Sequence, residues 1–172
     1  MLQTMHSVEE RATPYATVND FLRTFNEEMH SLYLLSFLLT ADHDKAEQCL
    51  VSAIGACVDG IGVFTDWARL WTRRAVLKHA IQMIKPAPEH TDQAFISLKR
   101  SAALVENNPF AAILLLEPFE RFVFVMSILE EQSDEECAIL LRCSRRDVMM
   151  ARLLALKRQS STDALAEEIL QA

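Results

Sequence analysis

The sequence predicts an all-α protein built from two small helical domains. The chain has 172 residues but only 3 glycines and 5 prolines, so it has few of the residues that most readily build tight turns. Hydrophobic residues make up 51% of it, as in globular proteins rather than disordered ones. Apolar residues also recur along most of the chain at the spacing of one helix face. Long helices joined by short links therefore fit this sequence better than a many-stranded fold.

The first predicted domain covers residues 17–85 and contains three helices. Apolar side chains at helical spacing predict these helices over residues 17–42, 44–58 and 65–84. The first of them begins at a group of side chains that can cap a helix N-terminus. The third ends before the two prolines of residues 85–88, because proline cannot continue a helix.

A linker over residues 86–107 is expected to separate this part from a second domain over residues 108–160. The linker contains two prolines and has weaker apolar periodicity. In the second domain, Ser133 and Glu136 have the spacing of a capping box at the start of a short helix. Ser144 is expected to cap the next helix, and a separate short amphipathic helix is expected over residues 163–170.

The short helix, the tight turn and the helix after Ser144 predict a helix-turn-helix, in which the second helix enters the DNA major groove. The whole chain carries a net charge of −7, yet this region is basic. Arg145 and Arg146 lie in the first helical turn, where the helix dipole disfavours cations, so a phosphate or a guanine edge would compensate them. The expected DNA contacts are Ser144, Arg145, Arg146, Met149, Arg152, Lys157 and Arg158.

The C-terminal region resembles the DNA-binding region of extracytoplasmic-function sigma factors, a family of RNA polymerase subunits. The resemblance covers residues 116–124, 129–138 and 141–148. The matching residues are Leu116 and Pro118, the following Arg121, the link Leu129–Glu130 to Ser133, the pair Glu136 and Ala138, and Ser144 before the recognition helix. It implies that this region binds the upstream promoter element.

The N-terminal part resembles the region of the same family that binds polymerase and melts promoter DNA. Residues 32–42, 46–47 and 71–75 follow the family's order and spacing. The resemblance implies a downstream DNA surface and a polymerase surface, although residues 48–53 depart from the family's acidic polymerase-binding motif. The expected residues are Arg69, Arg73, Arg74 and Lys78 for DNA, and Glu47, Gln48, Val51 and Ser52 for polymerase.

Two tryptophans and four cysteines are interpreted as core residues. Trp67 and Trp71 lie four residues apart and are expected to pack in the core, with stacking on a melted DNA strand as the alternative. The cysteines are Cys49, Cys57, Cys137 and Cys143. None forms a C-x-x-C pair, so reduced, mostly buried thiols are expected, with a zinc or redox site at Cys49/Cys57 or Cys137/Cys143 as the alternative.

Other classes of protein find little support in the sequence. It contains no glycine-rich phosphate loop, no G-x-S-x-G and no H-E-x-x-H, and its five histidines are scattered. We therefore expect no enzyme, no cofactor and no metal site. The N-terminal segment lacks the apolar core of a signal peptide, and the apolar run 32–39 is too short to cross a bilayer. A cytoplasmic protein without membrane contact is expected.

The resemblance implies a sigma-type transcription initiation factor, whose partners would be promoter DNA and the RNA polymerase core. One alternative is a sigma-like regulator that has lost polymerase binding and acts by protein contact, with an anti-sigma factor or as a homodimer. A further alternative is a helix-turn-helix regulator unrelated to sigma factors.

Overall fold

The computed structural model describes residues 15–59, 62–88 and 110–170, with side chains as far as Gln159. Within these residues the secondary structure is helical, apart from one isolated antiparallel bridge between Tyr15 and Phe64. The prediction of an all-α protein is therefore confirmed. No helix in the described part of the chain combines the length and the apolar character needed to cross a membrane.

The first part of the chain forms a bundle of three helices, as predicted. These are α1 (Val18–Thr40), α2 (His43–Val58) and α3 (Ala68–Ile84). The expected single helix over 65–84 begins instead with the short 3-10 helix η1 (Thr65–Trp67). Thr17 caps α1 together with Asp20 in a capping box, and Asp42 accepts a hydrogen bond from the Lys45 amide at the start of α2.

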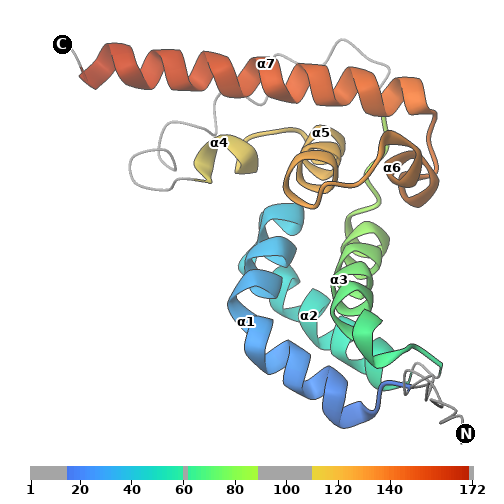
Figure 1. Cartoon of the computed structure of the whole chain (residues 1–172). Coiled ribbons are helices and arrows are strands. Elements are labelled where there is room, and N and C mark those ends of the chain that lie inside the picture. Colours follow the sequence, from blue (N-terminus) through green and yellow to red (C-terminus); the bar gives the residue numbers. More distant parts are fainter. Residues whose placement is uncertain (1–14, 60–61, 89–109, 171–172) are drawn as a thin grey trace, which may run out of the picture.

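The second part of the chain forms a layer on the bundle, covered by one long helix (Figure 1). The layer contains α4 (Ala111–Leu114), α5 (Pro118–Phe124), the π-helical turn η3 (Val125–Leu129) and α6 (Asp134–Leu141), and α7 (Arg145–Leu170) lies across its outer side. The predicted separate helix over 163–170 is wrong, because no glycine or proline interrupts residues 159–162 and α7 continues through them.

Several helix ends adopt a left-handed backbone without glycine. Ala41, Lys85 and Arg142 follow α1, α3 and α6 with φ values of 53°, 51° and 54°. Glu131, two residues after the end of η3, has a φ of 53°. Glycine is the residue that adopts this conformation at little cost. Lys85 ends α3 directly before Pro86, as the sequence predicts.

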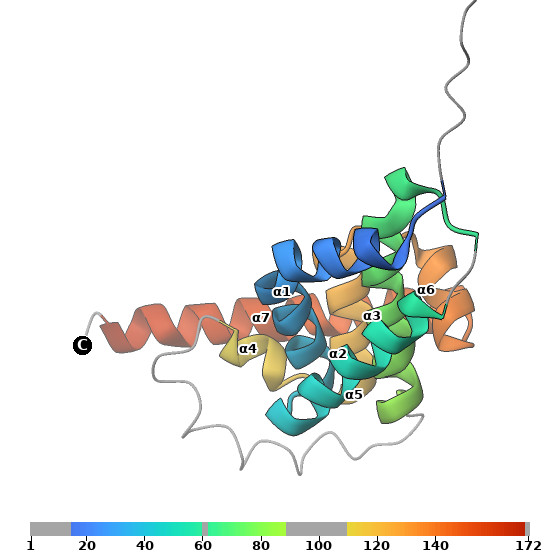
Figure 2. The same ribbon diagram turned by 90° about the horizontal axis from the view of Figure 1, so that it is seen from below.

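The bundle and the layer share one hydrophobic cluster. Buried residues of α1, α2 and α3, such as Leu39 and Leu77, belong to the same cluster as Phe122 of α5 and Val148 of α7. Helices α1 and α5 are in contact. Figure 2, seen from below, shows the bundle overlying α5, with α7 extending beyond it. The two predicted domains are thus joined by a common core, while residues 89–107 of the expected linker lie outside the described residues.

Two arginines hold these parts together. Arg121 of α5 is buried, and its guanidinium donates hydrogen bonds to the carbonyls of Leu39 (3.3 Å), Leu114 (3.4 Å) and Leu116 (3.0 Å). Burial lowers the pKa of Arg121 to about 10. Arg73 of α3 donates to both carboxylate oxygens of Glu130, at 2.8 and 2.5 Å. Helix α1 is therefore tied to α5, and α3 to the segment after η3.

Replacing Arg121 tests whether the shared core depends on this buried cation. Arg121→Ala should lower the free energy of unfolding by about 2–4 kcal/mol, because it leaves a cavity and unpaired carbonyl groups. Arg121→Met keeps most of the side-chain volume and should lose less. Denaturant unfolding measures both, with the exposed Arg23→Ala as control, for which we expect a change of about 0.5 kcal/mol or less. An Arg121→Ala loss no larger than that of the control would contradict this role.

Candidate nucleic-acid interface

Helix α6, a short turn and helix α7 follow one another at the place where the sequence predicts a helix-turn-helix. Residues 142–144 make the turn between them. Ser133 and Glu136 form the predicted capping box of α6. Ser144 caps α7 in the same way, since its hydroxyl accepts from the Asp147 amide at 3.1 Å while Asp147 accepts from the Ser144 amide at 2.9 Å. Short polar interactions thus fix where both helices begin.

Side chains on the inner side of α7 hold it against the layer. Val148, Ala151 and Ala155 are buried in the shared cluster. Arg152 donates to both oxygens of Asp134, at 2.5 and 3.2 Å, and so ties α7 to the first turn of α6. Arg158 donates to Glu120 of α5 at 2.7 Å. Burial raises the pKa of Glu120, and the charge of Arg158 opposes this effect.

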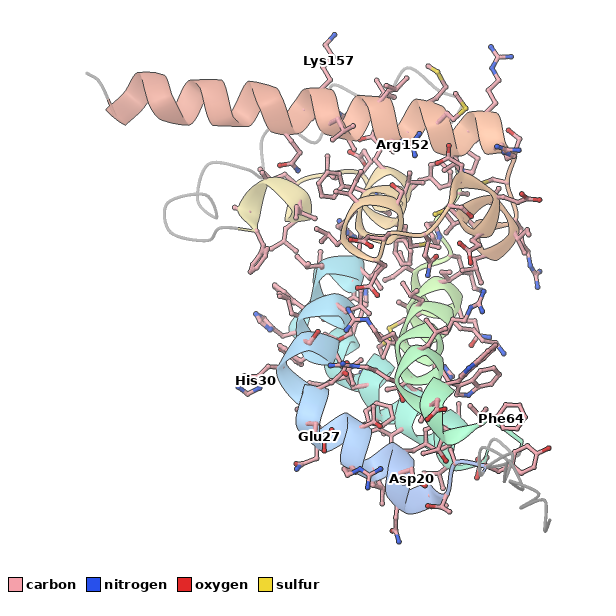
Figure 3. The ribbon with its side chains drawn as sticks, in the orientation of Figure 1. Asp20, Glu27, His30, Phe64, Arg152 and Lys157 are labelled. Carbon is pink, nitrogen blue, oxygen red and sulfur yellow. The ribbon has the colours of Figure 1, made fainter. Side chains whose placement is uncertain are left out.

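Two of the predicted DNA-contacting cations remain available at the start of α7. The side chains of Arg145 and Arg146 are exposed, and neither forms an ion pair or hydrogen bond with the residues that the structure describes. Figure 3 shows Lys157 projecting from the outer side of α7, whereas Arg152 lies on the side that faces the layer. Arg152 and Arg158 are therefore structural cations, whereas Arg145 and Arg146 are exposed and Lys157 points outward.

The outward side of α7 also carries large apolar side chains. Met149, Met150, Leu153 and Leu154 are all exposed. A polar side chain in these positions would hydrogen-bond to base edges more readily than methionine or leucine. Met149 thus has the exposure that a DNA contact requires, but contributes only apolar surface.

The predicted DNA-contacting cations of α3 are mostly engaged in ion pairs. Arg69 and Arg73 both pair with Glu28 of α1, and Arg73 also donates to Ser31 at 2.9 Å. The Arg74 guanidinium lies 3.9 Å from the carboxylate of Glu136. Lys78 is exposed and lies about one turn beyond Arg74 along α3. The four residues therefore do not form one continuous cationic strip.

The prediction that Trp67 and Trp71 pack in the core is wrong. Their exposed fractions are 64% and 44%, and Leu70 between them is exposed as well. Phe64 and Tyr15 stack on each other near the same end of α3, with ring centroids 5.0 Å apart. In this part of α3 the buried side chains are small ones instead, those of Ala68, Thr72 and Ala75.

The residues expected to bind polymerase share one exposed patch on α2. Glu47, Gln48, Val51 and Ser52 are all exposed and line a shallow depression together with Asp44 and Met83. Val51 is 70% exposed, so its apolar side chain is accessible to a partner. The patch lies on a different helix from α7, so the two surfaces do not compete for the same residues.

The cysteines have the environment of buried thiols. Cys49, Cys57 and Cys137 are buried, Cys143 is partly exposed, and all four are free. Burial raises the pKa of Cys49 and of Cys137 to about 11, so these thiols remain protonated near neutral pH. Within the described residues, no three histidine, cysteine or acidic side chains are grouped as they would be around a metal ion.

Sequence reasoning missed the carboxylates that neutralise the arginines. Glu28 is buried and lies on the same side of α1 as Phe21, Phe25 and Leu32. An acidic residue inside such an apolar stripe is a signal that a cationic partner lies opposite, because an unpaired buried charge is very costly. That signal identifies Glu28 as paired, but not which arginine pairs with it.

Comparison with protein-family models, with curated proteins and with solved structures finds no match for this chain.

Proposed function

We propose that this chain is a sigma-type transcription initiation factor, which binds promoter DNA through α6 and α7 and RNA polymerase through α2. The observation that carries the proposal is the exposure of Arg145 and Arg146 at the first turn of a capped helix in a helix-turn-helix. By contrast, Arg152 and Arg158 of the same helix have carboxylate partners.

The position of the two arginines favours an anionic ligand. Cations at a helix N-terminus are disfavoured by the helix dipole, and Asp147 is already hydrogen-bonded to Ser144. A DNA phosphate would relieve this cost, and a guanine edge would accept a bidentate arginine. Phosphate contacts would supply most of the affinity, and base contacts the specificity.

The exposed tryptophans support a role for α3 in binding unpaired DNA. Aromatic rings on a protein surface can stack on the bases of a single strand. Trp67 and Trp71 are exposed next to Arg69, Arg73 and Arg74, whose charges are partly neutralised by carboxylates. On this proposal, stacking contributes more to the downstream contact than phosphate binding does.

The patch on α2 would bind the polymerase core. Val51 supplies an exposed apolar centre, and Glu47, Gln48 and Ser52 surround it with polar groups. An apolar centre with a polar rim is the usual composition of a protein–protein interface.

A second candidate function is regulation by protein contact, with no need for DNA. It is favoured by the four exposed apolar residues Met149, Met150, Leu153 and Leu154 on the outward side of α7. Methionine and leucine on one helix side are common where proteins bind other helices. A homodimer or an anti-sigma factor bound there would cover the same side of α7 that DNA would need.

The DNA-binding role predicts that Arg146→Ala weakens binding to a selected duplex by about 1–3 kcal/mol, because a base-reading arginine contributes about that much. The duplex is first selected from a random pool with the unmodified chain, and affinities are then measured by fluorescence anisotropy at several salt concentrations. Arg23→Ala, which removes a cation at the far end of the bundle, should leave the affinity unchanged. Equal affinities of Arg146→Ala and the unmodified chain would exclude this contact.

The polymerase-binding role predicts that the tagged chain captures core polymerase and supports run-off transcription. Val51→Asp should reduce the capture at least about tenfold, because a charge would replace the apolar centre of the patch. Val18→Asp changes an exposed valine at the start of α1, where an acidic residue is tolerated, and serves as the matched control. If the unmodified chain captures no polymerase, the initiation role is lost and the second candidate remains.

The second candidate predicts self-association that depends on α7. Sedimentation velocity should then show a dimer whose dissociation constant rises at least about tenfold in Leu153→Glu, since the substitution places a charge in an apolar contact. Leu22→Glu alters another exposed leucine, in α1, as a control. A chain that remains monomeric at high concentration would argue against the homodimer.

A further inference from the structure

A cleft of about 680 Å³ lies between the C-terminal half of α3 and the helix α6. The cleft therefore lies where the three-helix bundle meets α6, and Figure 1 shows α6 beneath α7 and the end of α3 below α6. Its volume falls within the range of small-molecule sites in proteins, which is roughly 300–1,000 Å³. Five apolar residues, three cations and Gln82 line it.

Most of the lining is apolar. Pro86 and Leu141 are buried, and Ile81 and Leu140 are partly buried. Ile139 is 69% exposed, among the highest values of any large apolar side chain in the described residues. An isoleucine exposed at the edge of a cleft favours an apolar ligand, because its burial would be stabilising.

The charged residues of the lining all have the same sign. Lys78, Lys85 and Arg142 line the cleft, and among the described residues no carboxylate lines it with them. Lys85 and Arg142 are helix C-cap residues, so their charges also offset the partial negative charge of the helix ends. Lys78 lies two turns before the end of α3, and capping does not account for it.

We propose that this cleft binds a small organic anion with an apolar body, of the class of medium-chain carboxylates. The carboxylate would lie among Lys78, Lys85 and Arg142, and the alkyl chain would contact Ile81 and Ile139. Such a ligand contacts α3 and α6 together, so its binding stabilises the observed arrangement of the bundle and the helix-turn-helix. Of the expected DNA contacts the cleft uses only Lys78, and it uses none of the residues proposed for base reading or polymerase binding. The inference therefore holds whether or not those roles do.

The same cations could instead hold DNA phosphates, which would make Lys78 part of a nucleic-acid surface. The apolar lining argues against that assignment, since a phosphate gains nothing from Ile139 or Leu140. If the cleft binds an organic anion, neutralising Lys78 or Arg142 weakens binding of that anion. If the cations hold DNA phosphates, it weakens binding of DNA.

The experiment uses the full chain and measures binding by isothermal titration calorimetry together with the shift in Tm. The probes are decanoate, neutral decanol and acetate, all below the concentration at which decanoate forms micelles. We expect decanoate to bind with a Kd of about 0.1–1 mM and to raise the Tm. Decanol should bind at least about fivefold more weakly, because it lacks the charge, and acetate should give no measurable binding.

Three substitutions and one control locate the site. Lys78→Gln, Arg142→Asn and Ile139→Ser should each weaken decanoate binding about fivefold, which corresponds to about 1 kcal/mol per contact. Asparagine is chosen at position 142 because it tolerates the left-handed backbone. Lys45→Gln neutralises an exposed lysine of α2, away from the cleft, and should leave decanoate binding unchanged.

Loss of decanoate affinity in these variants supports the proposal, whatever they do to DNA affinity. Three results would overturn it: no decanoate binding at about 1 mM, equal affinity for decanol, or unchanged decanoate affinity in Lys78→Gln and Arg142→Asn. If those two variants weaken duplex binding alone, the cations serve DNA phosphates instead.

Discussion

The arrangement of the two halves depends on a buried guanidinium group. Arg121 satisfies three carbonyl groups, one at the end of α1 and two in the segment before α5. A charged donor inside an apolar core is stable only when its hydrogen bonds are made, so the backbone around it is held in place. Apolar side chains alone would not specify how α5 sits on α1, because hydrophobic contact is non-directional.

Paired and unpaired side chains also distinguish two groups of arginines. Arg73, Arg152 and Arg158 each have a carboxylate from another element and fix the position of the helix that carries them. Arg145 and Arg146 have no such partner among the described residues, and they lie at the exposed start of α7. A ligand that binds them therefore meets a helix whose orientation is already set, and pays little ordering entropy on the protein side.

Local features could be predicted from the sequence, whereas long-range pairs could not. Thr17, Ser133 and Ser144 cap helices through residues three positions away, and their hydrogen bonds follow from spacing alone. The partner of Arg73 is 57 residues distant, so only the folded chain identifies it. Trp67 and Trp71 fit a buried stripe by spacing and size, but small residues occupy the side of α3 that faces the bundle. The spacing of apolar residues predicts which of them share a side of the helix, but packing against the neighbouring helices determines which side is buried.

The helix ends carry a consequence for how this sequence can change. Ala41, Lys85, Glu131 and Arg142 hold a backbone conformation that costs an ordinary side chain roughly 1 kcal/mol or more. The chain has 3 glycines and places none of them at these positions. The summed conformational cost of these four positions is a sizeable part of the net free energy of unfolding of a typical domain. Substitution to glycine at any of the four positions would remove that cost. Such substitutions could compensate for stability lost when new surface residues are acquired during evolution.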